Sequence, residues 1–313
     1  MPTLSEIISE KNRRLETIPA EFQSNVERLQ RGIYNRITEL IGELEVKNGQ
    51  IVMSEANLLR VEMINEEMKK VLNGKEYISA VKEFVSEFDK QKVINDEYFK
   101  KAFGDDFSQV GIANQILKNS QRSAFEMLAG AQAEQNFIAP IRTQLEQAVA
   151  SGASYKDTIT SIRETVEGTE DADGRLLKYS KQVTWDAFAI SDAAYTNAVA
   201  EDLDVEWYSY LGGLVGDSRC FCEERDGGYY HYKEIEAWGR GEDLGECDIG
   251  DGTWQGEMTG TNEATIFLTK GGYHCKHSWM PVSLISVPMD DIQRNINNGN
   301  FVPSEFEKKE LNL

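Results

Sequence analysis

The segment AEFQSNVERLQRGIYNRITELIGELEVK, residues 20–47, decides the fold class of the first half of the chain. Its apolar side chains recur at every third or fourth position: Phe22, Val26, Leu29, Ile33, Ile37, Leu40 and Leu44. This spacing places them on one stripe of an α-helix about 40 Å long. Asn48-Gly49 follows as a left-handed stop signal. The segment therefore predicts a long amphipathic helix that ends near residue 47.

The rest of the first 200 residues has the same helical character. No proline occurs between Pro19 and Pro140, so long helices can run there without a break. Further helices are predicted over residues 54–72, 77–90, 96–103, 108–137, 141–150, 155–167 and 176–201. An apolar stripe usually packs against a neighbouring helix of the same chain and less often awaits a partner. We therefore expect a mostly α protein in which residues 1–203 form an elongated bundle of long helices.

The chain beyond residue 200 has a different composition. It holds 15 of the 25 glycines, and all five tryptophans of the protein lie beyond residue 184. Aromatic and β-branched residues favour strands, and glycine favours tight turns. Strands are predicted over residues 205–211, 266–269 and 280–287, and a short helix over residues 232–238. We therefore expect a small α+β domain over residues 204–290, followed by a charged tail over residues 291–313.

Composition limits the classes of function. The chain has 313 residues, 40% of them hydrophobic, which is enough for two domains with their own cores. Its formal charge of −20 disfavours a protein whose main task is to grip nucleic acid, although a secondary contact through a local basic patch is left open. No long apolar run and no signal peptide is recognisable, so a membrane role is not predicted. We expect a soluble protein in the cytoplasm, with reduced thiols and protein partners.

All four cysteines and all three histidines lie within residues 220–277, which predicts a metal centre in the α+β domain. Structural zinc takes four sulfur or nitrogen ligands, and a small loop-rich domain gains folding energy by binding it. The first three predicted ligands are Cys222, Cys275 and His277. The last two are close enough in sequence for a tight turn to direct both inward, and Cys222 ties in a distant loop. The predicted zinc ion would therefore staple the domain.

The fourth ligand is chosen among Cys220, His274 and His231. Cys220 leads, because a Cys-x-Cys pair can converge on one ion, although Cys-x-x-Cys is the commoner spacing. Cys247 lies in an acidic loop without a second ligand at a suitable spacing, and we leave it out of the site. Two other interpretations stay open: the cysteines and histidines are simply buried side chains, or two of the cysteines form a disulfide.

A second group of residues precedes Cys220. Asp217 is suited to cap a turn and Arg219 to pair with a nearby carboxylate, which are structural roles. The catalytic alternative pairs Arg219 with an acid such as Glu263 at an anion site. The sequence has no phosphate loop, no His-Glu-x-x-His run and no glycine-flanked nucleophilic serine, and it supplies no convincing general base. We therefore expect a protein that is not an enzyme.

A series of short motifs follows a fixed order in the second half: Asp217-Ser218-Arg219, Phe221-Cys222, Glu234-Ile235, Trp238, Trp254-x-Gly256, Gly271-Gly272-Tyr273-x-Cys275-Lys276-His277 and Pro281-Val282. This order resembles the C-terminal domain of phage head morphogenesis proteins, the Mu F-like minor head protein family of tailed phages. The resemblance covers roughly residues 175–288. It implies five framework residues: Asp217, Arg219, Cys222, Cys275 and His277. Cys220 and His274 depart from the family pattern.

The resemblance also implies a function. Such a protein is expected in the virion interior near the portal, and in the host cytoplasm during assembly. Its partners would be the portal protein, the major capsid protein or both, and it would aid head assembly and DNA packaging or ejection. Two alternatives remain: a zinc-dependent hydrolase or anion-processing enzyme that uses Arg219 and an open metal position, and a helical scaffold or adaptor unrelated to phage.

Overall fold

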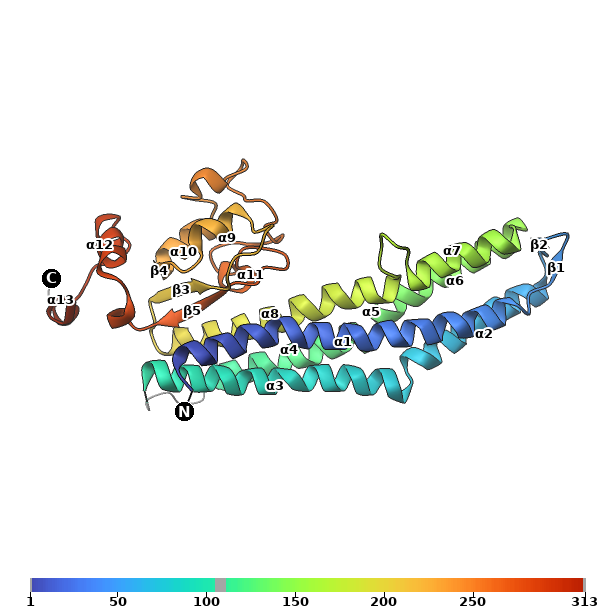
Figure 1. Ribbon diagram of the computed structural model, residues 1–313, viewed down its shortest axis with the longest axis horizontal. Helices are drawn as coiled ribbons and strands as arrows, with labels where there is room; N and C mark the ends of the chain where they lie inside the picture. Colours follow the sequence, from blue (N-terminus) through green and yellow to red (C-terminus); the bar gives the residue numbers. More distant parts are fainter. Residues whose placement is uncertain (1, 105–110, 312–313) are drawn as a thin grey trace. The chain divides into compact units, whose positions relative to one another are not determined.

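The computed structural model describes residues 2–104 and 111–311 (Figure 1). The described part is mostly helical, as the sequence predicts, and has two small sheets. Helices dominate up to residue 202: α1 (Leu4–Ile41), α2 (Glu55–Leu72), α3 (Lys75–Phe103), α4 (Gly111–Ala129), α5 (Ala131–Ala133), the π-helical turn η1 (Glu134–Ile138), α6 (Ala139–Ser151), α7 (Tyr155–Glu167) and α8 (Arg175–Asp202).

Shorter elements follow, and they build the second sheet and its surroundings. They are β3 (Trp207–Leu211), α9 (Cys220–Arg225), β4 (Tyr229–His231), α10 (Tyr232–Gly239), η2 (Gly245–Cys247), α11 (Ile266–Thr269), β5 (Ser278–Val282), η3 (Leu284–Ser286), α12 (Met289–Asn297) and α13 (Glu305–Leu311). No helix of the described ranges combines the length and the apolar character that crossing a bilayer requires.

The chain packs into two compact units, each assembled from segments that are distant in sequence. The sheet unit comprises Met1–Glu16, Phe88–Asn119 and Phe188–Leu313, and the helical unit comprises Thr17–Glu87 and Ser120–Ala187. Each of the long helices α1, α3, α4 and α8 contributes residues to both units. The predicted boundaries after residues 203 and 290 follow the order of the sequence, whereas these packing units do not.

Several predicted helices are found where the pattern places them. Helix α2 starts after Ser54, whose hydroxyl oxygen accepts a hydrogen bond from the Asn57 backbone N–H over 3.2 Å. Ser154 caps α7 in the same way. Such side-chain caps satisfy N–H groups that the first helical turn leaves unpaired. Residues predicted as two helices, 77–90 and 96–103, form the single helix α3.

The stop signal at residues 48–49 was interpreted wrongly. Helix α1 begins at Leu4, includes Pro19 and ends at Ile41. Asn48 and Gly49, with φ of 52° and 77°, instead form the two-residue turn of a hairpin between β1 (Val46–Lys47) and β2 (Gln50–Ile51). Asn-Gly is the preferred pair for such turns because both positions need a positive φ. The Asn-Gly pair is therefore compatible with either a helix end or a hairpin turn.

Two other elements differ from expectation. The helix predicted over residues 108–137 breaks at Gly130, and its predicted start at residue 108 lies outside the described residues. Ile266–Thr269, predicted as a strand, is the helical turn α11. The Asn262 side chain accepts hydrogen bonds from the backbone N–H groups of Ala264 and Thr265, and this local turn leads directly into α11.

The sheet that positions the candidate site has three antiparallel strands in the order β4-β3-β5. Tyr210 of β3 pairs with Trp279 of β5, and Trp207 pairs with His231 of β4. Ring contacts continue from Tyr210 to Trp279, whose centroids are 4.2 Å apart, and from Trp279 to Trp238 of α10. The described tryptophans beyond β3 are thus part of one aromatic core.

Residues 291–313, predicted as a charged tail, contribute to the core of the sheet unit. Ile292 of α12 and Phe301 are buried and pack with Val287 against Trp207. The rings of Trp207 and Phe301 meet edge to face at 5.4 Å. Asp290 and Gln293 of α12 are exposed while Ile292 and Asn295 are buried, so the segment is amphipathic rather than uniformly charged.

A buried polar network joins three helical segments of the sheet unit. Lys11 of α1 lies 3.1 Å from the Asp192 carboxylate of α8 and donates to Asn95 of α3 over 2.9 Å and to Thr196 over 3.0 Å. Asp192 also accepts hydrogen bonds from Asn95 and Gln91. Lys11 and Asp192 are only 1% and 3% exposed, so their charges are compensated by each other and by neutral donors and acceptors.

Candidate metal centre

Cys222, Cys275 and His277 come together in the sheet unit, as the sequence predicts. The Sγ atoms of Cys222 and Cys275 are 3.8 Å apart, and His277 Nδ1 lies 3.8 Å from Cys275 Sγ. The three donor atoms all lie within 4.8 Å of one another, and the three side chains are buried. Cys222 comes from α9, whereas Cys275 and His277 lie just before β5. The cluster thus links two segments through Cys222 and Cys275, which are 53 residues apart in sequence, as expected for a metal staple.

A carboxylate orients the histidine of this cluster. Asp226 Oδ1 lies 3.1 Å from His277 Nε2 and accepts a hydrogen bond from the Gly213 backbone N–H over 3.2 Å. This contact leaves Nδ1 of the imidazole facing the sulfur atoms. A histidine with one ring nitrogen toward a metal and the other held by a carboxylate is a common arrangement in metal centres. Asp226 therefore fits the role of a positioning residue.

Tyr210 completes the surroundings of the two sulfur atoms. Its hydroxyl lies 3.6 Å from Cys222 Sγ and 3.3 Å from Cys275 Sγ. Its ring stacks on the His277 imidazole with centroids 4.6 Å apart and 10° between the planes. The side chain is also fully buried. One phenol thus lies beside all three predicted ligands.

The absence of a side chain at Gly271 allows the backbone to pass close to these donor atoms. A Cβ atom on Gly271 would lie 2.5 Å from Cys222 Sγ, 2.8 Å from the Tyr210 hydroxyl and 3.0 Å from Cys275 Sγ. Real Cβ atoms do not approach other atoms so closely. The two sulfur atoms and the Tyr210 hydroxyl therefore border a common small space that any side chain at position 271 would fill.

Arg219 holds the loop that carries Gly271. Its guanidinium donates to the Gly271 carbonyl over 3.3 Å and also to the Tyr273 carbonyl. Trp254 Nε1 donates to the same Gly271 carbonyl over 3.1 Å. Arg219 thus has a structural role, but its contacts here are with backbone carbonyls, whereas the sequence analysis predicted a carboxylate partner. Asp217, the other predicted framework residue of this motif, is exposed and lies outside the cluster.

Protonation follows from the mutual contacts of the two thiols. The hydrogen bond from the Cys222 thiol lowers the pKa of Cys275, against the effect of burial, and contacts with His277 and Tyr210 lower it further. The same hydrogen bond, together with burial, raises the pKa of Cys222. Burial also raises the pKa of the Tyr210 phenol well above its usual value. Of the two sulfur atoms, that of Cys275 is thus the one that ionises more readily.

The donor set fits a metal ion. Two bonds of about 2.3 Å at a tetrahedral angle separate their sulfur atoms by about 3.8 Å, which is the separation found between Cys222 and Cys275. Thiolate and imidazole donors that face a common space can hold a metal ion. Cys222, Cys275 and His277 would be its ligands.

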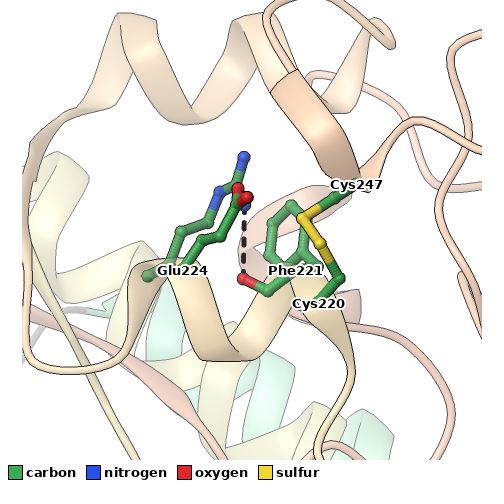
Figure 2. Close-up of a disulfide and its surroundings, with 5 residues drawn as sticks. Cys220, Phe221, Glu224 and Cys247 are labelled. Carbon is green, nitrogen blue, oxygen red and sulfur yellow. Dashed lines mark hydrogen bonds and ion pairs between the residues drawn. A yellow bond between two sulfur atoms is a disulfide. The ribbon is translucent and has the colours of Figure 1, made fainter.

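Cys220, predicted to lead as the fourth ligand, is not part of this cluster. It forms a disulfide with Cys247, the cysteine that the sequence analysis set aside, as Figure 2 shows. Cys220 and Cys222 both lie on helix α9, where side chains two positions apart point to different sides. The expectation of reduced thiols is therefore wrong for the pair Cys220 and Cys247, and the Cys-x-Cys spacing does not converge on one ion.

The other two histidines also lie elsewhere. His274 is exposed, has a φ of 56° and is outside the cluster, so it does not supply the fourth ligand. His231 is buried and contacts the rings of Trp207 and Phe301, with centroid separations of 5.3 and 5.6 Å. It caps α10 by accepting a hydrogen bond from the Lys233 backbone N–H.

Replacing Cys220 by serine is expected to leave metal binding unchanged and to lower stability. The lost disulfide links cysteines that are 27 residues apart in sequence. In the chain-entropy model such a cross-link stabilises the folded protein by about 3 to 4 kcal/mol. Metal content of the purified variant and chemical denaturation would measure the two effects. Cys247→Ser is the matched control and should behave identically. Loss of metal from both variants would contradict the separation of the disulfide from the cluster.

His231 is expected to make stability depend on pH. Burial, and to a lesser degree Lys233, lowers its pKa from 6.5 to about 4, even though Glu206 lies 3.6 Å away. Between these two values the unfolded chain binds the proton and the folded chain does not. The stabilisation from the neutral imidazole is therefore complete above pH 6.5 and is lost as the pH falls toward 4, by up to about 3 kcal/mol at about 1.4 kcal/mol per unit.

The measurement is the free energy of unfolding between pH 7 and pH 4. The curve for His231→Gln should be flatter than that of the wild type over this range. Equal pH dependence in the wild type and His231→Gln would show that His231 does not titrate between the two states in this way.

Comparison with known proteins adds no relative to these observations. The chain matches no family model, no curated protein and no solved structure.

Proposed function

We propose that Cys222, Cys275 and His277 bind a zinc ion that cross-links the sheet unit. Zinc suits a mixed set of thiolate and imidazole donors and needs no redox chemistry. All three side chains are buried, which keeps a substrate from the ion and favours a structural role over a catalytic one. Asp226 would orient His277, and Arg219 and Gly271 would shape the loop around the ion.

We infer that the protein is a non-enzymatic minor head protein of a tailed phage, of the Mu F-like kind. The observation that carries this proposal is the convergence of the ordered motifs. Arg219, Cys222, Gly271, Cys275 and His277, which carry the resemblance in sequence, make direct contacts with one another in one cluster or its supporting loop. Residues that share a motif for a structural reason are expected to behave in this way.

The proposed location is the virion interior, with the host cytoplasm as the place of assembly. The partners would be the portal protein, the major capsid protein or both, reached through the long amphipathic helices. The net charge of −20 makes nucleic acid a secondary contact at most. Head assembly, and DNA packaging or ejection near the portal, would be the processes served.

Purified particles provide the test. Virions of the phage that encodes the chain should contain it, and its amount per particle should stay constant through repeated density-gradient centrifugation. Co-expression with the portal protein should yield a complex that survives purification. A chain that stays in the soluble lysate while complete particles form without it would refute this function.

Two alternatives from other classes have distinct signatures. A zinc hydrolase or anion-processing enzyme would hold zinc by three protein ligands and a water molecule, and it would expose that position to substrate. A helical scaffold or adaptor unrelated to phage would be encoded away from head and packaging genes. Ligand count at the metal and the neighbouring genes therefore separate these functions from the proposed one.

A further inference from the structure

We propose that Tyr210 is the fourth ligand of the metal centre, through its phenolate oxygen. This inference rests on the proposed zinc site and adds the ligand that closes it. Within the described ranges, the group of possible metal-binding Cys, His, Asp and Glu side chains at this place has only three members. Tyrosine is not one of these four residue types, so the position of its phenol is judged from the distances between its hydroxyl and the sulfur atoms.

The Tyr210 hydroxyl has the separations from both sulfur atoms that an oxygen ligand at a neighbouring corner of a tetrahedron needs. Zinc bonds of about 2.3 Å to sulfur and about 2.0 Å to an anionic oxygen imply sulfur-to-oxygen edges of about 3.5 Å. The hydroxyl lies 3.6 Å from Cys222 Sγ and 3.3 Å from Cys275 Sγ. It also borders the small space beside Gly271 that both sulfur atoms face. An ion held by the two sulfurs in that space would be within bonding reach of this oxygen.

The fold fixes Tyr210 in this position. The residue lies in the middle of the sheet on β3, where its backbone pairs with Trp279. Its ring contacts both the His277 imidazole and the Trp279 ring, with centroid separations of 4.6 and 4.2 Å. A ring packed in this way cannot leave the cluster without disturbing the aromatic core, so little reorganisation is needed for ligation.

Zinc binding must then remove the phenol proton, which passes to the buffer as the oxygen–zinc bond forms. The experiment is a zinc titration of the chelator-treated full-length protein at neutral pH, followed by ultraviolet difference absorption. One tyrosinate should appear for each zinc ion bound. Tyr210→Phe should lack this signal and bind zinc about 10- to 100-fold more weakly. Tyr208→Phe changes another buried tyrosine of the same strand and should retain both the signal and the affinity.

Each result decides one statement. Stoichiometric zinc binding by the wild type without a tyrosinate signal would overturn the proposal and leave Tyr210 as a hydrogen-bond donor to the sulfurs, while the zinc site would stand. Absence of zinc binding by the wild type would instead refute the zinc site itself. If Tyr210→Phe fails to fold, the wild-type signal still decides, because a merely packed or hydrogen-bonded phenol remains protonated at neutral pH.

Discussion

Cys275→Ser is expected to lose the metal and to unfold the region after residue 205 while most of the helical content remains. Serine cannot supply the thiolate that both Cys222 and His277 face, and zinc binding contributes about 10 to 16 kcal/mol of apparent free energy in small zinc domains. The aromatic core between β3 and β5 depends on the same cross-link, so its ordered ring contacts should disappear.

Three measurements follow this change. Zinc content should fall from about one ion per chain to none, the near-ultraviolet circular dichroism of the buried tryptophans should collapse, and the far-ultraviolet helical signal should stay largely intact. His274→Ser is the matched control, because it alters an exposed side chain next to Cys275 and should change none of the three. Full thermal stability of Cys275→Ser, and of the wild type in a strong chelator, would refute the proposed cross-link.

Asp192→Ala is expected to destabilise the sheet unit by about 3 to 5 kcal/mol, because it leaves the Lys11 ammonium buried without its partner. Although burial opposes its ionisation, attraction to Lys11 and Lys270 and hydrogen bonds from Asn95 and Gln91 hold the pKa of Asp192 below its ordinary value. The carboxylate is therefore charged in the folded protein, and its removal exposes the full desolvation penalty of the lysine.

Chemical denaturation of full-length variants measures this loss. Asp173→Ala is the control, because Asp173 pairs with Lys181 at the surface over 2.8 Å and should contribute about 1 kcal/mol or less. The double change Lys11→Met with Asp192→Leu should restore much of the stability, since apolar side chains of similar volume often replace a buried pair without loss. Equal destabilisation by Asp192→Ala and Asp173→Ala would show that the buried ion pair contributes no more to stability than the surface pair.

The sequence was most informative where one periodic signal extends over many residues. Helices α2, α7 and α8 lie within one residue of their predicted bounds, because an apolar stripe with a Ser cap or a glycine boundary determines them locally. It was least informative where one short signal has two uses. Asn48-Gly49 fits a helix end or a hairpin turn, and tertiary packing selects the hairpin.

The candidate site shows the same limit. Cys222, Cys275 and His277 were recognisable by residue type and clustering in sequence. The exclusion of Cys220 depends on the helical conformation of Cys220–Arg225, which its six residues do not reveal. Tyr210 and Asp226 were missed because their proximity arises from long-range register: β3 pairs with β5, and the Gly212-Gly213 turn brings Asp226 to His277. The only available signal for Tyr210 was its place in a predicted aromatic strand.

The discontinuous composition of the sheet unit has a consequence for synthesis on the ribosome. Lys11 leaves the ribosome long before Asp192, and at about 5 to 20 residues per second the delay is about 10 to 40 s. During this time the amino-terminal segment Met1–Glu16 lacks the partners that bury it in the finished protein. The sheet unit is therefore completed late in translation. Factors that shield nascent chains would have most to protect before that point.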